Sequence, residues 1–282
     1  MKIFPNPRAI IVEAGRLFES SNAKEIQPEK WQGLELKTPM IEIFDTTFRC
    51  NIPDTLEILQ NQCSPDLPWA DNHFEERISG IPSNPGNTYK DWPYYKEDEY
   101  RKEIFTHTYQ ERFWPKKAGN TLMIELEGDS KYPFKKLDFT DFPKDHTHPN
   151  NLGIRYPYGD LKDLINHLSS NPTTRQAYLP IWFPEDTGVV HEGRVPCTLG
   201  YLFSYREGYL HITYYLRSCD YIRHFKNDIY LAIRLLYFVL ESLKNSNSKL
   251  DWNKVKPGRF TFHIQSLHIF KSDLYELKKR LK

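Results

Sequence analysis

The chain lacks three features that would each indicate a particular class of protein. Its 282 residues include 38 lysines and arginines against 37 aspartates and glutamates, so the net charge of +1 indicates no polyanionic partner. It has 4 cysteines without a CxxC pair, too few for a disulfide framework. No segment approaches the ~20 uncharged apolar residues of a membrane span, and no such run follows the N-terminal lysine. We expect a soluble, cytoplasmic protein that binds neither membranes nor nucleic acid.

The rest of the sequence predicts one domain over residues 1–282 with an insertion at about 80–150. The insertion alternates prolines with aromatic residues, and because disordered segments are poor in aromatics we expect it to be irregular but anchored. The regular elements that we expect are helices over 11–18, 160–168 and 228–243, and strands over 39–48 and 175–183.

A predicted hairpin contains the most informative cysteine. Two strand-like runs flank Arg206-Glu207-Gly208. If the hairpin is centred on Glu207, residues whose numbers add to 414 face each other, and Cys197 lies opposite Arg217. A neighbouring guanidinium would lower the pKa of the thiol from about 8.5 toward neutrality, which would make it a usable nucleophile. A bulge would shift this register by one residue. The alternative is that Cys197 is a small buried apolar residue.

The apolar helix over 228–243 begins with a carboxylate. The helix is apolar on nearly every face, so it should run through the core with Asp228 at its mouth. An aspartate at this position can accept backbone N–H bonds as an N-cap and interact with the helix dipole. From the residues alone, capping is the favoured role.

Several ordered motifs resemble the thymidylate synthase superfamily. Pro196-Cys197 is similar to the nucleophile motif, and Arg217-Ser218 is similar to the phosphate-binding pair. The segment that ends at Phe270 resembles the family's ribose motif, in which His268 would contact the sugar. The order and spacing of these motifs make the resemblance more specific than any one of them.

Two upstream segments extend this resemblance, which covers roughly residues 150–280 firmly and the first 80 loosely. The segment around Arg175 resembles the one that sends an arginine across a dimer interface to the partner's nucleotide phosphate. Tyr158-Gly159 is similar to the family's tyrosine–glycine pair. The resemblance implies an α/β fold with a mixed sheet wrapped by helices, and a homodimer packed through the sheets.

One position of the family decides which pyrimidine is bound. Counted from Arg217, Asp228 takes the place of the asparagine that bonds uracil in thymidylate synthases, and the segment resembles that of phage deoxycytidylate hydroxymethylases. A carboxyl group can accept from the cytosine amino group and, when protonated, donate to the ring nitrogen. The neighbouring Asn227 is the second candidate for contact with the base. If it were the true equivalent, uracil would be the substrate.

The resemblance implies a mechanism and a cofactor. Cys197 would add to pyrimidine carbon 6, and carbon 5 of dCMP or CMP would then take a one-carbon unit from 5,10-methylenetetrahydrofolate. Only twelve residues follow Phe270, so we expect the site to admit water and the product to be hydroxymethylated. For the proton-relaying glutamate we choose Glu76, although an ungapped count reaches His73. The alternative is that Glu76 belongs to a solvated helix face.

Other functions remain open on the sequence alone. A thymidylate synthase or a dUMP hydroxymethylase would use the same residues, and a non-catalytic homodimer that binds nucleotides or RNA would keep the scaffold. A hydroxymethylated product could serve phage DNA modification or a nucleoside antibiotic. His146 and His148 lack a clear further ligand, so we expect no metal.

Overall fold

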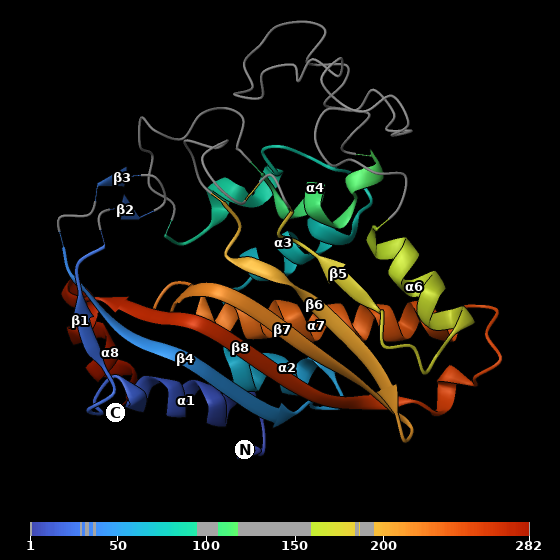
Figure 1. The fold of residues 1–282 in the computed structure, drawn as a ribbon, viewed down its shortest axis with the longest axis horizontal. Helices are drawn as coiled ribbons and strands as arrows, with labels where there is room; N and C mark the ends of the chain where they lie inside the picture. Colours follow the sequence, from blue (N-terminus) through green and yellow to red (C-terminus); the bar gives the residue numbers. More distant parts are fainter. Residues whose placement is uncertain are drawn as a thin grey trace, which may run out of the picture.

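A six-stranded mixed sheet organises the molecule (Figure 1). The computed structural model describes residues 2–28, 30–31, 34–35, 38–94, 107–117, 159–183, 186 and 195–281. In spatial order the sheet contains β1 (Lys24–Ile26), β4 (Met40–Asn51), β8 (Lys256–Phe270), β7 (Tyr209–Asp220), β6 (Thr198–Arg206) and β5 (Tyr178–Pro180). Only the central pair β7–β8 is parallel. β2 (Lys30–Trp31) and β3 (Leu34–Glu35) form a separate ribbon.

Helices cover the sheet, as expected for the α/β class. The α-helices described are α1 (Pro7–Leu17), α2 (Leu56–Cys63), α3 (Trp69–Ile78), α4 (Tyr109–Phe113), α6 (Leu161–Ser170), α7 (Phe225–Lys244) and α8 (Leu274–Leu281). The long helix α7 packs on β7 and β8 and also contacts α1, α2, α3 and α6 (Figure 1). Most of its residues are buried, so it forms the centre of the apolar core. The predicted architecture, a mixed sheet wrapped by helices, is confirmed.

The β6–β7 hairpin has a register that differs from the prediction. Glu207 and Gly208 form a two-residue turn with φ of 51° and 82°, which is the backbone of a type I′ turn. Facing residues therefore have numbers that add to 415 along most of the ladder, so centring the hairpin on Glu207 was wrong. A bulge between Thr198 and Gly200 then shifts the pairing, so that the numbers of facing residues add to 414 beyond it. Cys197 consequently faces Arg217, and the Arg217 N–H donates to the Cys197 carbonyl at 2.9 Å.

Helix α7 begins three residues earlier than predicted. His224 occupies the N-cap position, and the Asp228 N–H already donates to the His224 carbonyl at 2.8 Å. Asp228 therefore lies in the first turn of the helix, so the expected N-cap role is wrong. Its carboxyl group is available for another function.

The described parts of the predicted 80–150 insertion lie against the core. They include a short 3₁₀ helix, η1 (Asn87–Asp91), and α4, and the aromatic side chains of Trp92, Phe113 and Trp114 are buried. α4 opens with a capping box between Thr108 and Glu111. These segments bring residues far from the hairpin in sequence to the end of the sheet where Cys197 lies.

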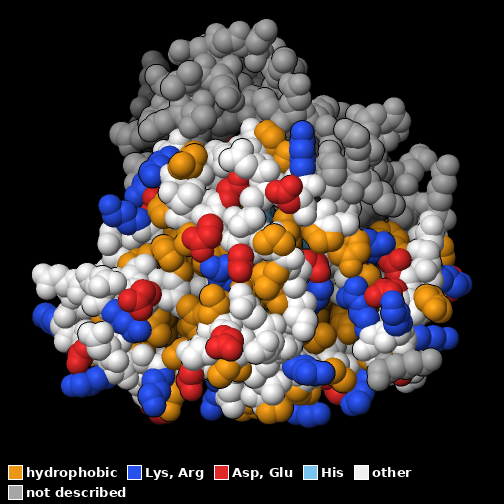
Figure 2. Space-filling view, turned by 180° about the vertical axis from the view of Figure 1, so that it is seen from behind, with side chains coloured by type: hydrophobic (Ala, Val, Ile, Leu, Met, Phe, Trp, Pro, Cys, Tyr) orange, Lys and Arg blue, Asp and Glu red, His pale blue; other side chains and the backbone are white. Residues whose placement is uncertain are grey.

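Charges of both signs are interspersed over the surface seen from behind (Figure 2). This distribution agrees with the small net charge. Among the described residues, none of the helices has the length and apolarity needed to cross a membrane.

Candidate active site

Cys197 and Arg217 form the centre of the candidate site. The Arg217 Nη2 lies 3.9 Å from the Cys197 Sγ, and the cysteine is half-buried. Backbone carbonyls orient the guanidinium, because Nε donates to Pro196 O at 2.8 Å and Nη2 donates to Val195 O at 3.1 Å. Arginine carries five N–H donors, so this arrangement leaves donors for an anion beside the sulfur.

Ser218 and His268 lie next to this pair. The neighbouring strands β7 and β8 bring the Ser218 Oγ to 3.5 Å from the His268 Nδ1. His268 is buried, and within the described part of the chain its Nε2 has no hydrogen-bond partner. Burial lowers the pKa of His268, so the ring favours its neutral form. Buried polar atoms without a partner are rare in folded proteins, so a ligand at this position would satisfy the ring nitrogen.

Asp228 contributes a carboxyl group from the first turn of α7. The Cys219 Sγ lies 3.4 Å from its Oδ2, and burial raises the pKa of this thiol, which therefore donates the hydrogen bond. Burial also raises the pKa of Asp228 to about 7, although the nearby charge of Arg77 opposes the rise. Near neutral pH the carboxyl group is therefore populated both with and without its proton.

Asn227 has a different environment from its neighbour. It is 1% exposed, and its Oδ1 accepts from the Asp66 N–H at 2.9 Å while its Nδ2 donates to the Asp66 Oδ2 at 2.9 Å. The amide therefore ties α7 to the segment before α3. Of the two candidates for contact with a base, only Asp228 has a carboxyl group beside the cysteine-bearing strands.

A group of tyrosines connects Asp228 to the cysteine strand. The Tyr109 OH lies 2.9 Å from the Thr198 Oγ1, which in turn lies 2.8 Å from the Tyr214 OH. Tyr201 stacks on Tyr214 with 4.5 Å between ring centroids. Asp228 acts electrostatically on all three tyrosines, and burial raises the pKa of each, so the hydroxyls keep their protons. The site thus has protonated hydroxyls next to the residue that follows Cys197.

Sequence reasoning missed Arg77 and Tyr109. Arg77 is buried on α3, and its Cζ lies 4.0 Å from the centroid of the Tyr109 ring. The sequence contains one signal that could have indicated Arg77, since His73 and Arg77 are four apart and share a helix face. Tyr109 lies in the predicted insertion, where no periodic pattern points to a site.

Glu76 is held in a hydrogen-bond network. Its carboxylate accepts from the Thr88 hydroxyl and from the Gln110 amide, both at 2.7 Å, and from the Asn87 N–H. Burial alone would raise its pKa, but the neighbouring His73 and the hydrogen bonds from Thr88 and Asn87 outweigh burial and lower the pKa of Glu76 to about 2. A carboxylate with this pKa stays ionised near neutral pH, which suits an anchor better than a proton relay.

The remaining predicted residues are exposed or lie outside the residues that the structure describes. Arg175 is exposed between α6 and β5. Tyr158, and the histidines His146 and His148, lie outside the described residues. Within the described ranges, no group of three His, Cys, Asp or Glu side chains could hold a metal ion.

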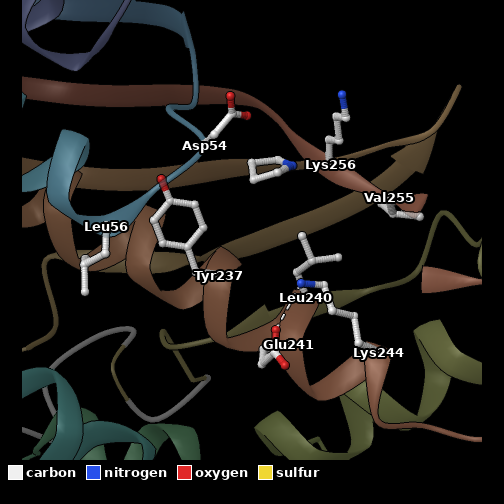
Figure 3. Close-up of a pocket in the computed structure, with 9 residues that line it drawn as sticks. Asp54, Leu56, Tyr237, Leu240, Glu241, Lys244, Val255 and Lys256 are labelled. Carbon is white, nitrogen blue, oxygen red and sulfur yellow. Dashed lines mark hydrogen bonds and ion pairs between the residues drawn. The ribbon is translucent and has the colours of Figure 1, made fainter. Parts of the chain in front are cut away.

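A surface pocket lies at the far end of α7 from Asp228 (Figure 3). Its lining includes Tyr237, Lys244 and Lys256, and Figure 3 shows the ion pair between Lys244 and Glu241, which is 3.0 Å long. At 1.5 Å of rise per residue, the last turn of α7 is about 20 Å from Asp228. The pocket contains none of the predicted site residues, so it is separate from the candidate site.

The C-terminal part of the chain is similar to known proteins. Residues 155–282 match the family model described as thymidylate synthase. A protein of Methanosarcina barkeri named "Putative thymidylate synthase" is 31% identical over 110 residues, which cover 39% of this chain and 45% of that protein. One of the same name from Methanococcoides burtonii is 26% identical over 170 residues, 56% of this chain and 72% of that protein. The chain thus spans less than half the length of the first relative.

The fold is also similar to a solved structure. Thymidylate synthase from T4 phage superposes with a TM-score of 0.53 at 18% sequence identity, over 98% of this chain and 79% of that one. At this identity the likeness concerns the fold.

Proposed function

We propose, from the premise that the chain belongs to the thymidylate synthase superfamily, that it is a pyrimidine nucleotide 5-hydroxymethyltransferase acting on a cytidine nucleotide, dCMP or CMP. The observation that carries the choice of base is Asp228, a carboxyl group with a pKa of about 7 beside the cysteine-bearing strands. Thymidylate formation and uridylate hydroxymethylation are the competing outcomes.

Cys197 begins the reaction. A guanidinium 3.9 Å from the sulfur favours the thiolate, which adds to carbon 6 of the ring and makes carbon 5 nucleophilic. With the folate bound, carbon 5 would take the one-carbon unit; loss of the carbon 5 proton and departure of tetrahydrofolate, as its carbon–nitrogen bond breaks, would then leave an exocyclic methylene on the pyrimidine ring. After water has added to the exocyclic methylene, the thiolate leaves carbon 6 and the free enzyme returns. The carbon–sulfur bond that forms at the start breaks at the end, so the cysteine is not consumed.

The cofactor, 5,10-methylenetetrahydrofolate, supplies the one-carbon unit at the oxidation level of formaldehyde. Beside the start of α7, Trp92 and His224 stack on each other at 4.9 Å, and Trp69 lies next to Trp92 with ring centroids 6.4 Å apart. Because Trp92 and His224 cover each other's faces, a pteridine ring would contact this aromatic cluster at its edge, where His224 is half-buried. Hydroxymethylation involves no hydride transfer, so it requires no reductant.

Asp228 selects the base through one proton. Cytosine presents an amino donor and an acceptor nitrogen, so two hydrogen bonds with a carboxyl group require a proton on the carboxyl or on the ring nitrogen. An asparagine cannot satisfy this edge as it satisfies uracil, and an unpaired buried polar group costs about 1–3 kcal/mol. Because the pKa of Asp228 is about 7, we expect affinity for cytidine nucleotides to fall as the pH rises above 7.

The phosphate and the sugar would lie on the other side of Cys197. The Arg217 donors that no described residue accepts from, together with the Ser218 hydroxyl, would bind the phosphate, and the His268 Nε2, which has no hydrogen-bond partner among the described residues, would bind the sugar. Arg175 is exposed, and in a homodimer packed through the sheets it would reach the nucleotide of the partner subunit. The protein would then bind its nucleotide and folate as a dimer.

Asp228→Asn tests the assignment. Product formation from CMP, dCMP, UMP and dUMP would be followed by mass spectrometry, where hydroxymethylation adds one CH₂O unit and methylation adds one CH₂ unit. Wild type should convert a cytidine nucleotide, and Asp228→Asn should lower kcat/KM for it by about 5- to 150-fold, the equivalent of 1–3 kcal/mol, and favour the uridine nucleotide.

Asn227→Ala is the matched control. It removes the two hydrogen bonds to Asp66 and should lower stability without changing the preference for cytosine. Conversion of dUMP alone by the wild type would contradict the proposal, and a product carrying a methyl group would replace hydroxymethylation with methylation. Absence of a covalent adduct with a 5-fluoropyrimidine nucleotide and the folate would favour a non-catalytic binding protein.

A further inference from the structure

Arg77 is a buried cation that no carboxylate of the described residues contacts. The residue is 6% exposed, and no carboxylate within the described ranges lies within 4.0 Å of its guanidinium. Its planar group rests on the ring of Tyr109. Burial of a charge is unfavourable unless an opposite charge or hydrogen bonds compensate for it. The hydrogen bonds of Arg77 therefore show what holds the charge at this place.

A directional chain of hydrogen bonds fixes Arg77. Its Nε and Nη2 lie 3.0 and 2.8 Å from the His73 Nε2. Arginine only donates, so His73 Nε2 accepts and the ring proton is on Nδ1. That nitrogen lies 3.2 Å from the Thr88 Oγ1, which therefore accepts from it and donates its own proton to Glu76 at 2.7 Å. Arg77 is thus connected to the Glu76 carboxylate at the other end of this series of hydrogen bonds.

The surroundings of His73 fix the direction of these hydrogen bonds. Trp69 stacks on the imidazole at 5.0 Å and 15°, and its Nε1 donates to the Thr88 carbonyl at 3.1 Å. Burial, followed by the charge of Arg77, lowers the pKa of His73 to about 4, so the ring is neutral near neutral pH. Arg77 is consequently held in one orientation by a rigid neutral partner.

Arg77 and Asp228 lie on two helices that pack against each other, α3 and α7, and the positive charge of Arg77 favours the ionised form of Asp228. After burial it has the largest influence on that carboxyl group, and it acts in the direction opposite to burial. The other titratable groups that interact with Asp228 are neutral acids or an anion from three neighbouring elements: Tyr109 on α4, Tyr201 on β6, and Tyr214, Cys219 and Asp220 on β7. Among these groups, only Arg77 favours the ionised carboxylate by its charge.

We propose that Arg77 is a positioning residue that sets how far Asp228 is protonated, and thereby the pH range in which the site accepts a cytosine base. This inference rests on the proposed function, because protonation of Asp228 matters only if the carboxyl group meets the base. The matching of one arginine to one carboxyl group would tune specificity without contact between the arginine and the reacting carbons.

Two variants separate the charge of Arg77 from its packing. Arg77→Gln removes the charge and keeps an amide that can donate to His73, whereas Arg77→Lys keeps the charge. The Asp228 carboxyl group would be titrated by ¹³C NMR in aspartate-labelled protein, with its signal assigned by its loss in Asp228→Asn. We expect the midpoint to rise by about one pH unit or more in Arg77→Gln and to return toward the wild-type value in Arg77→Lys.

The substrate provides a second readout. Above its midpoint, the wild-type KM for the cytidine nucleotide should rise about tenfold per pH unit, since the protonated carboxyl group becomes scarce. In Arg77→Gln this rise should begin about one unit higher. Arg234→Gln is the matched control, because Arg234 is an arginine on the same helix as Asp228 but pairs with Asp71 and Glu75. It should leave both the titration and the pH profile unchanged.

Two outcomes would overturn the inference about Arg77. Equal Asp228 midpoints in wild type and Arg77→Gln would overturn the inference. If Arg77→Gln and Arg77→Met both fail to fold while Arg77→Lys folds, Arg77 serves folding alone and the inference is equally overturned. A shifted midpoint without turnover of any cytidine nucleotide would instead overturn the hydroxymethyltransferase proposal and leave the coupling of Arg77 to Asp228 intact.

Discussion

The two sides of the candidate site are built in different ways. On the strand side, backbone carbonyls of Val195 and Pro196 fix Arg217, and strand pairing places Ser218 beside His268. On the helix side, the described residues that hold the Arg77 guanidinium do so with side chains, through the hydrogen bonds by which Arg77 meets His73, His73 meets Thr88 and Thr88 meets Glu76. Geometry set by a ladder of backbone hydrogen bonds depends little on side-chain identity, whereas a series of hydrogen-bonded side chains changes when any one of them is replaced.

This difference indicates how chemistry and specificity are divided. The strand side carries the motifs that resemble those of the thymidylate synthase superfamily, and the proposed addition to the ring occurs there. The helix side carries groups that the motifs do not include, and these act on the carboxyl group proposed to recognise the base. Changes on the strand side should therefore affect rate and phosphate binding, and changes on the helix side should affect pH dependence and stability.

The strongest test of the strand side is Cys197→Ser. A serine hydroxyl beside Arg217 is a far weaker nucleophile than a thiolate, so we expect kcat to fall by at least ~10³-fold and the covalent adduct to disappear. Intact-protein mass spectrometry after incubation with a 5-fluoropyrimidine nucleotide and the folate would measure the adduct. Cys63→Ala, in the apolar core, should retain it. An adduct of unchanged yield in Cys197→Ser would place the nucleophile elsewhere.

The strand side was also the part that the sequence predicted best. A short Gly-containing loop between two strand-like runs defines a hairpin, and this local pattern placed Cys197 opposite Arg217. The predicted centre was wrong by half a residue, and the bulge near Thr198 compensated for the error. Bulges depend on the packing of the whole sheet, so the sequence of two strands does not reveal them.

The helix side could not be predicted for a physical reason. Arg77 and Tyr109 meet only because α3 and α4 dock together, and docking depends on long-range packing without a periodic signal. The role of Asp228 as an N-cap was wrong for a related reason. The turn before α7 carries backbone bonds from His224 to Asp220 and from Asp228 to His224, so the helix begins before its apolar run.

Arg217→Lys measures the contribution of geometry on the strand side. Lysine keeps the charge but lacks the planar guanidinium, which donates to the Pro196 and Val195 carbonyls and still has donors for an anion. We therefore expect KM for the nucleotide to rise about tenfold, with a smaller change in kcat. For the corresponding nucleoside, which lacks the phosphate, KM should rise much less. Arg206→Lys, at the exposed turn of the same hairpin, serves as the control. An equal loss for nucleotide and nucleoside would remove Arg217 from phosphate binding.

The smallest expected effect tests the anchor of the helix side. Glu76→Gln weakens the charged hydrogen bonds to Thr88 and Asn87 and should lower the free energy of unfolding at pH 7 by about 2 kcal/mol, measured by urea denaturation. Its pKa of about 2 lies below the value of about 4.3 expected in the unfolded chain, so its stabilisation is complete above pH 4.3 and is lost as the pH falls toward 2.

The difference between wild type and Glu76→Gln should therefore shrink between pH 4.3 and pH 2, while the difference at pH 7 stays constant up to pH 8. Glu75→Gln is the matched control, since its side chain is 63% exposed and its ion pair with Arg234 lies at the surface. That substitution should cost less than about 0.5 kcal/mol at any pH. If the two variants lose the same stability with the same pH dependence, Glu76 is not an anchor, and the helix side must hold Arg77 by packing alone.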